Sequence, residues 1–273
     1  MIINTNMMAL NAQNMLGRNQ GTVEKAVNRL SSGLRINSAS DDAAGLAISE
    51  KMRSQIRGLD QATSNANDGI SLIQTAEGAL QQTTDILQRM RELVIKAENS
   101  GVLSDEDKVA IEVEIAALTT EIDRIGDSTT FNGKKLLDGT EGPFSFKIGA
   151  NTLTCDSITI SIGSMKTDEL TVDDIKIDTS TNANNSLKAI DAAIAKVSDQ
   201  RARLGAVQNR MEYAIENLTT ASENLTAAES RIRDVNMADE MVTFTKNNIL
   251  QQSAMAMLAQ ANKQPEQILT LLQ

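Results

Sequence analysis

Residues 66–97 read ANDGISLIQTAEGALQQTTDILQRMRELVIKA, with an apolar side chain at every seventh position. This ladder extends over residues 42–98 and comprises Met52, Leu59, Ala66, Ile73, Leu80, Leu87 and Val94. A second ladder of the same period, in residues 187–235, comprises Ile190, Val197, Leu204, Met211, Leu218, Leu225 and Ile232. Sustained heptads are typical of coiled coils, and helices of this kind are about 70–80 Å long at roughly 1.5 Å per residue.

The apolar seam of each long helix needs a partner, so we expect helices 42–98 and 187–235 to pair antiparallel. Ser104 and Asp107 resemble a capping box, which predicts a third helix over residues 105–125. Between residues 140 and 178 apolar and polar residues alternate around Phe144 and Ile160, which predicts a β-hairpin region. The expected fold is mainly α: a long antiparallel helical coiled-coil bundle with a small β-hairpin region and paired chain termini.

The two ends of the chain differ from this body. Residues 1–41 and 236–273 carry interrupted apolar stripes, little charge and many Asn and Gln residues. Segments of this composition bury too little apolar surface to order alone. We therefore expect a terminal helical domain, formed by these two ranges, that is disordered in the monomer and orders when neighbouring copies bury its stripes. Its packing candidates are Met8, Met15, Leu30, Leu34, Met241, Phe244, Leu250, Met257, Leu258, Leu269 and Leu272.

Composition argues against several functional classes. The chain has no histidine and one cysteine, Cys155, so internal disulfides, Cys/His zinc sites and His-dependent catalytic sites are not expected. Asp41 and Asp42 stand just before a helix, where capping is a better interpretation than paired catalytic or metal-binding carboxylates. We predict no enzyme activity, cofactor or metal. For Cys155, a small residue in a half-buried strand is the first interpretation, and a redox or intermolecular role is the alternative.

The net charge of −10 disfavours nucleic acid as a partner. No apolar run approaches the roughly 20 residues needed to span a bilayer, so membrane insertion is not expected. The N-terminus shows no secretory signal pattern.

Two segments resemble bacterial flagellins, the subunits of the flagellar filament. Residues 30–49, LSSGLRINSASDDAAGLAIS, are similar to the N-terminal signature of that family. Residues 224–235, NLTAAESRIRDV, and residues 244–250, FTKNNIL, are similar to its C-terminal half. The resemblance covers residues 1–139 and 186–273 and implies a structural subunit that polymerises into a filament used for motility. It also implies that residues 1–41 and 236–273 form the inner filament core and residues 42–235 a rod domain, without outer domains.

The same resemblance implies partners and a location. The partners are further copies of the chain, the flagellar export apparatus, a cytoplasmic flagellin chaperone, and the cap and junction proteins. The protein is expected to be extracellular, exported through the flagellar secretion channel without a cleaved signal peptide.

A short motif in residues 87–94, LQRMRELV, implies one further partner by resemblance. Gln88, Arg89, Leu93 and Glu114 match residues by which flagellins contact the flagellin-sensing Toll-like receptor of animal hosts. Arg89 and Leu93 fall off the heptad seam, so we expect both to face outward. Solvation of the helix, or contact with a neighbouring subunit, is the alternative interpretation of Arg89.

Two other functions remain open. A hook–filament junction protein shares the terminal helices of flagellins, and a soluble coiled-coil adaptor or secretion chaperone would use the same heptads.

Overall fold

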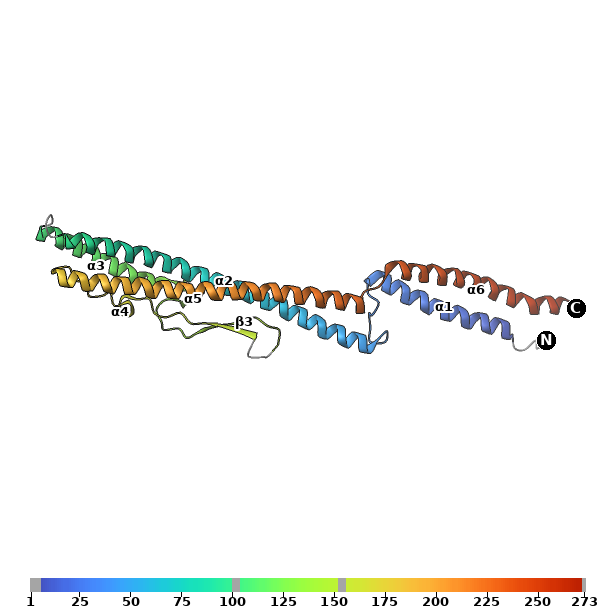
Figure 1. Cartoon of the computed structure of the whole chain (residues 1–273). Coiled ribbons are helices and arrows are strands. Elements are labelled where there is room, and N and C mark those ends of the chain that lie inside the picture. Colours follow the sequence, from blue (N-terminus) through green and yellow to red (C-terminus); the bar gives the residue numbers. More distant parts are fainter. Residues whose placement is uncertain (1–5, 100–103, 152–155, 272–273) are drawn as a thin grey trace. The chain divides into compact units, whose positions relative to one another are not determined.

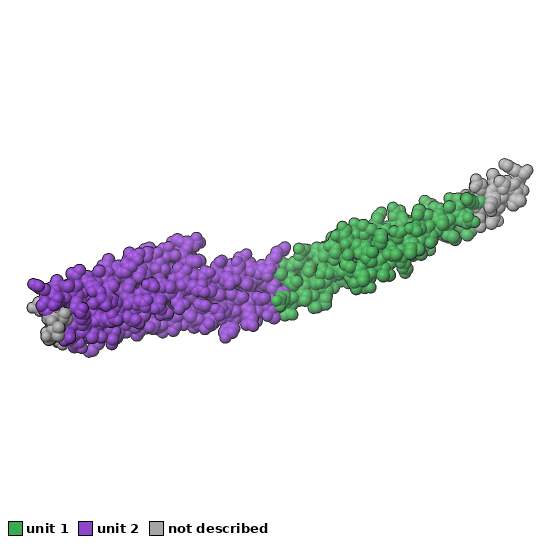
Figure 2. All heavy atoms as spheres, turned by 90° about the horizontal axis from the view of Figure 1, so that it is seen from above, with its two compact units in different colours: residues 1–56, 223–273 green, residues 57–222 purple. Residues whose placement is uncertain are grey.

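The computed structural model describes residues 6–99, 104–151 and 156–271 of the chain. Five helices dominate it: α1 (Met7–Ser32), α2 (Ala43–Glu98), α3 (Asp105–Ser128), α5 (Ser180–Arg233) and α6 (Met237–Leu271). Figure 1 shows them in sequence colours, and the mainly α fold is confirmed. The chain divides into two compact units (Figure 2): unit 1 comprises Met1–Ile56 and Glu223–Gln273, and unit 2 comprises Arg57–Ser222. Among the described residues, no helix has the length and apolar character of a membrane span.

In unit 2, α2 and α5 run antiparallel. The Oγ of Ser222 donates to Oδ1 of Asp60 at 3.1 Å, and the Nε of Arg91 donates to Oδ1 of Asp191 at 2.8 Å. The N-terminal part of α2 therefore lies beside the C-terminal part of α5, which is the antiparallel pairing that we expected from the two ladders. Ladder residues of both helices are almost fully buried in one core: Ala66, Ile73, Leu80, Leu87, Val94, Ile190, Val197, Leu204 and Met211.

Helix α3 covers a second side of α2. It begins with the predicted capping box, in which Asp107 accepts from the backbone N–H of Ser104 at 3.0 Å and the Ser104 hydroxyl accepts from the backbone N–H of Asp107. Ile111, Ile115 and Ile122 of α3 belong to the same core as the seam of α2. Because α3 lies in unit 2 only, the ladder residues of unit 1, such as Met52 and Leu225, are half-buried.

Two small hairpins follow α3. In the first, β1 (Thr130–Phe131) pairs with β2 (Lys134–Lys135), and Asn132 and Gly133 between them have φ values of 50° and 78°. Positive φ at both positions is what a type I′ turn requires. In the second, β3 (Phe144–Lys147) pairs antiparallel with β4 (Ser157–Ile160), which confirms the predicted hairpin. Phe144 lies opposite Ile160, and both are buried. A short helix, α4 (Thr167–Leu170), follows.

Helix α5 begins at Ser180, whereas the heptad pattern places its start at residue 187. The preceding loop stabilises the polar N-terminal turns of α5. Ser186 donates to the backbone carbonyl of Lys176 at 2.9 Å and accepts from the Lys176 N–H at 3.2 Å, and Ala183 is buried. Tertiary contacts thus extend the helix beyond its apolar pattern.

In unit 1, α1 and α6 lie side by side and antiparallel (Figure 1). The Nδ2 of Asn6 donates to the carbonyl of Ala261 at 2.8 Å, and Arg29 lies 3.8 Å from Glu240. The predicted pairing of the two ends of the chain is confirmed.

Candidate self-assembly surface

The contact between α1 and α6 uses one face of each helix. Ala26 of α1 and Ala261 of α6 are buried, and Leu30, Phe244 and Leu258 are half-buried. The small residues allow the two backbones to approach, and the larger ones fill the space beside them. Of the predicted packing residues, these three thus have part of their surface covered within the chain itself.

Other predicted packing residues remain exposed. The exposed fraction is 59% for both Met8 and Met15, 49% for Met241, 42% for Leu250 and 63% for Met257. Leu272, like Cys155, lies outside the described residues, and so does the side chain of Leu269. Two helices therefore pair and still leave many large apolar side chains in contact with water.

Helix α6 has apolar residues on all sides. Val242 and Ile249 are seven residues apart and share one exposed face, and Leu250 and Met257 share another. Met241 lies on a third, while half-buried residues such as Phe244 occupy the side toward α1. A helix that exposes several large apolar residues on more than one face is normally covered by a partner. The exposed faces of α6, together with Met8 and Met15 of α1, form the candidate assembly surface.

A compact segment, here named the joint, connects the helices of unit 1 and comprises residues 33–42 and 233–236. Gly33 ends α1 with a φ of 72°, and its N–H donates to the carbonyl of Arg29 at 2.8 Å. Leu34 and Asp234 form an isolated β-bridge, and the N–H of Val235 donates to the carbonyl of Gly33 at 3.0 Å. Leu34 thus packs in the joint instead of on a helix.

The side chains of the joint satisfy the ends of the neighbouring helices. Nη2 and Nε of Arg35 donate to the carbonyl of Ile232, near the C-terminus of α5. The Oδ1 of Asp42 accepts from the N–H of Gly45 at 2.9 Å, which confirms the capping interpretation for Asp42. A Cβ at Gly45 would lie 2.4 Å from Oδ2 of Asp42 and 2.7 Å from Cδ1 of the buried Ile36. Glycine is therefore the residue that fits there.

Asp41 organises the loop before α2. Its Oδ2 accepts from the backbone N–H of Ser38 at 3.1 Å, from the Ser38 hydroxyl at 3.0 Å and from the N–H of Asn37 at 3.3 Å. These bonds, those from Ser38 foremost, hold the pKa of the Asp41 carboxyl below its usual value.

A polar cluster that the sequence patterns did not indicate ties α2 to α5. Ser49 is fully buried and donates to Oε1 of Glu229 at 3.1 Å. Nη1 of Arg233 donates to Oε1 of Glu50 at 2.8 Å and to the Ser49 hydroxyl at 3.3 Å. Ser49 and Arg233 lie within residues 30–49 and 224–235, the two segments that resemble flagellins. That resemblance was the only feature of the sequence that pointed to these residues.

The residues predicted to contact a receptor differ in exposure: three of them are on the surface, and one is buried. Nη2 of Arg89 donates to Oε1 of Glu114 at 2.8 Å, and its Nη1 lies 3.3 Å from Oε2 of Glu92. The hydrogen bonds to Glu114, then to Glu92, raise the pKa of the Arg89 guanidinium. Gln88 is exposed beside them.

Leu93, in contrast, is 2% exposed and belongs to the core, so the expectation that it faces outward is wrong. The heptad seam describes one partner helix. The second partner, α3, covers the adjacent face of α2, where Leu93 lies.

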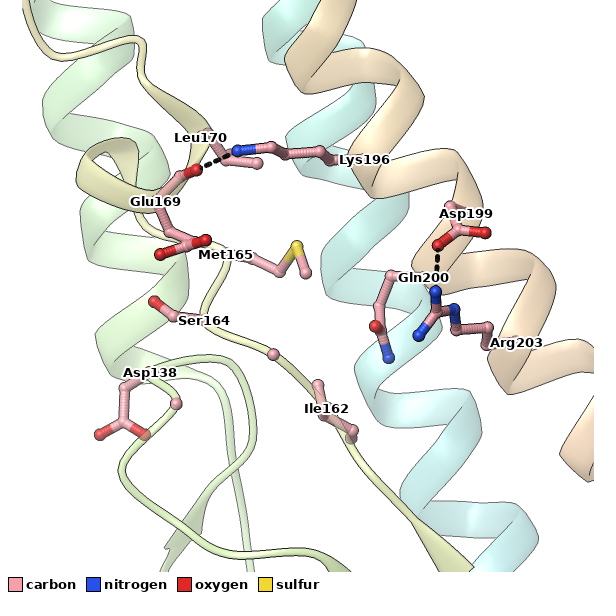
Figure 3. A pocket seen from close by; sticks show the side chains of 12 residues that line it. Asp138, Ile162, Ser164, Met165, Glu169, Leu170, Lys196, Asp199, Gln200 and Arg203 are labelled. Carbon is pink, nitrogen blue, oxygen red and sulfur yellow. Dashed lines mark hydrogen bonds and ion pairs between the residues drawn. The ribbon is translucent and has the colours of Figure 1, made fainter.

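A hollow of about 360 Å³ in unit 2 is lined by residues 138–139, 162–165 and 169–170 and by α5 (Figure 3). Its cations bond within the protein: Lys196 donates to the carbonyl of Glu169, and Nη2 of Arg203 lies 2.9 Å from Oδ2 of Asp199. Gln200 donates to the carbonyl of Ser161 at 3.2 Å. Its polar groups thus hold the loop on the helix, and the hollow is a structural feature of the loop packing.

Comparison with known proteins gives concordant matches. Residues 3–142 match the model of the bacterial flagellin N-terminal helical region, and residues 187–272 match that of the C-terminal helical region. The chain is 52% identical over 305 residues to a flagellin of Bacillus subtilis (strain 168), with both chains covered completely. It is 53% identical over 275 residues to a flagellin of Halalkalibacterium halodurans, again with both chains covered completely.

Solved structures agree with this. A crystal structure of Bacillus cereus flagellin, 28% identical, has a TM-score of 0.51 and covers 61% of this chain and 94% of its own. The structure of a protein described as flagellar hook-associated, from Vibrio parahaemolyticus, has a TM-score of 0.61 and covers 71% of this chain and 100% of its own. At 14% identity, the latter likeness concerns the fold alone.

Proposed function

The chain belongs to the bacterial flagellin family, and we propose that it joins the flagellar filament by ordering α1 and α6 as neighbouring copies cover them. As a flagellin it is a structural subunit of the extracellular filament and not an enzyme.

The observation that carries the assembly mechanism is the presence of large exposed apolar residues on several sides of α6. Completely burying a side chain such as Met257 or Leu250 contributes about 1.5–3 kcal/mol to the free energy that favours assembly. One copy of α1 covers one side of α6, so other chains must cover the remaining sides. A surface that binds a different surface on the next copy generates an open helical polymer instead of a closed ring.

Ordering the ends before assembly is costly. Fixing the backbone of each residue costs roughly 1–2 kcal/mol, and isolated helices are marginally stable in water. A single α1–α6 contact built largely from alanine and half-buried side chains offsets little of this cost. We infer that the ends are largely unfolded in the free subunit and fold as they are buried between copies.

A truncation tests this mechanism. A chain lacking residues 240–273 should retain the helical circular dichroism of unit 2 and fail to elongate filament seeds. Filaments of the truncated chain, seen by electron microscopy, would contradict the role assigned to the ends.

A point substitution makes the test sharper. Met257→Asp places a charge on an exposed face of α6 without entering its half-buried side toward α1, and it should block elongation. Met257→Leu, which keeps an apolar side chain of similar size, should elongate normally. Equal elongation by both variants would show that this face stays in water in the filament.

The junction-protein alternative rests on likeness of fold. Full-length identity of 52% and 53% to two flagellins favours the filament subunit. Deletion of the gene should remove the whole filament. A cell that keeps a filament weakly attached to its hook would instead indicate a junction protein.

We further infer that the exposed cluster of Gln88, Arg89 and Glu114 contacts the flagellin-sensing Toll-like receptor of animal hosts. The ion pair of Arg89 and Glu114 presents side chains of α2 and α3 together, which supports a single recognition surface. Arg89→Ala should weaken binding to the purified receptor ectodomain, whereas Arg124→Ala, also in an exposed ion pair on α3, should not. Equal binding of the receptor by the two variants would contradict this proposed interaction.

The remaining partners of the proposal are the flagellar export apparatus, a cytoplasmic flagellin chaperone, and the cap and junction proteins. Export through the flagellar channel leaves the chain uncleaved. Mass spectrometry of sheared filaments should therefore find the N-terminal peptide of residues 1–18 without loss of a leader, and a shortened N-terminus would contradict this route.

A further inference from the structure

The methionines of this chain are distributed unequally between the two units. Those of unit 2, Met90, Met165 and Met211, are at most 8% exposed. Seven in unit 1 are 48–63% exposed, and we name them the exposed methionines: Met7, Met8, Met15, Met237, Met241, Met255 and Met257. All seven lie on α1 or α6, so the thioethers open to solvent are concentrated on the helices of the assembly surface.

The thioether of methionine is the main oxidisable group available on these helices. The chain has 12 methionines, a single cysteine and no tryptophan or histidine. A peroxide transfers one oxygen atom to the sulfur: the sulfur lone pair attacks, the O–O bond breaks, an S–O bond forms, and water or an alcohol leaves. Access of the oxidant to the sulfur controls this reaction, so exposed methionines react before buried ones.

Oxidation to the sulfoxide makes the methionine side chain more polar, which disfavours its burial. A sulfoxide carries a strongly polar oxygen that accepts hydrogen bonds, whereas the thioether is apolar and flexible. An acceptor placed in an apolar interface without a donor is unfavourable. On α6 the exposed faces carry large apolar residues such as Val242, Ile249 and Leu250, so a sulfoxide oxygen placed among them is less favourable than the thioether once these faces are covered.

We propose that the exposed methionines are oxidation sites of the unassembled subunit, and that their conversion to the sulfoxide by a peroxide blocks its addition to the filament. The inference rests on the proposed function, because it requires that these side chains become buried between copies. It adds a consequence: the filament protects the same sulfurs once they are buried, and enzymatic reduction of the sulfoxide restores the subunit.

The test compares three samples of the full-length protein. Depolymerised subunits are treated with dilute hydrogen peroxide, the peroxide is removed, and peptide mass spectrometry locates the added oxygen atoms. Seeded elongation is then followed by sedimentation. The second sample is a variant with all seven exposed methionines replaced by leucine, which packs similarly and does not react. The third is intact filament, exposed to the same peroxide and then mapped.

We expect sulfoxide at the exposed methionines of the free subunit and little at Met90 and Met211. Each sulfoxide that must be buried should raise the critical concentration for elongation about tenfold. Whatever its rate of elongation before treatment, the leucine variant should keep that rate after treatment. In intact filament the exposed methionines should react far more slowly, and methionine sulfoxide reductase should restore elongation of the oxidised wild type.

Normal elongation of subunits that carry the mapped sulfoxides would overturn the inference and leave the proposed function standing. Equal loss of elongation by peroxide-treated leucine variant and wild type would overturn it as well, because another group would then be responsible. If the leucine variant does not assemble before treatment, rescue of the oxidised wild type by the reductase decides the question. Failure of untreated wild type to elongate would overturn the proposed function together with the inference.

Discussion

Substitution of Leu93 gives the sharpest test of how α3 packs against α2 in unit 2. Its position off the heptad ladder and its resemblance to a receptor-contact residue both suggest an exposed side chain, yet it is 2% exposed in the core with α3. Leu93→Ala removes a buried side chain and leaves a cavity, because close-packed neighbours relax only partly.

The expected effect is large. Leucine-to-alanine substitutions in close-packed cores lower the free energy of unfolding by about 2–5 kcal/mol. With a urea dependence of about 1–3 kcal/mol per molar, a loss of about 3 kcal/mol lowers the urea midpoint by roughly 1–3 M. Urea unfolding followed by far-ultraviolet circular dichroism measures this shift.

The matched control is Ile95→Ala on the same helix, two positions away. Ile95 is also a large aliphatic residue but is 46% exposed, so its truncation should shift the midpoint only slightly. Equal midpoints for the two variants would refute the assignment of Leu93 to the core. If the shift appears, any loss of receptor binding in Leu93→Ala reflects a disturbed α2–α3 contact and not the removal of a contact residue.

Gly33 and Gly78 both have open space for a Cβ but should respond to alanine with opposite sign. In assembled filaments, where α1 is folded, Gly33→Ala at a φ of 72° should lower thermal stability by about 1–2 kcal/mol, whereas Gly78→Ala inside α2 should raise it by about 0.5–1 kcal/mol. Calorimetry of filaments of both variants checks the pair, and equal signs would contradict the reasoning. Because Asp41 has a lowered pKa, its stabilisation of the joint is present above the ordinary value of 3.8 and is lost as the pH falls below it, through the folded pKa. Hydrogen exchange at the Ser38 amide should show this loss, and Asp41→Asn should abolish the dependence on pH. Ser104→Ala should destabilise the first turn of α3 by about 1 kcal/mol, measured by local hydrogen exchange, and unchanged exchange there would show that the capping box is dispensable.

Some features followed directly from local sequence. The seven-residue ladders located the buried seam, and Leu80 and Leu204 are indeed almost fully buried. The capping box of Ser104 and Asp107 marked the start of α3, and Asn followed by Gly is the dipeptide that favours the type I′ turn found at Asn132 and Gly133. Such signals are local because helix periodicity, capping and turn conformations depend on residues that are close in the chain.

Other features depended on contacts that no periodic pattern describes, some between neighbouring segments and some between distant ones. The early start of α5 follows from contacts between Ser186 and the loop before it, and the fit at Gly45 depends on Ile36 and Asp42. No periodic pattern predicts that Ser49 bonds Glu229, because the two residues lie on different helices and are 180 positions apart in the chain.

The chain alone therefore determined that long helices form, which of their faces is apolar, and that its two ends carry stripes in need of partners. The tertiary structure decided that α3 buries Leu93, that the joint orders the residues before α2, and that α6 keeps three apolar faces in water beside α1. The physical reason is that periodicity records how each helix is built, whereas burial depends on how many neighbours pack against it and on which sides.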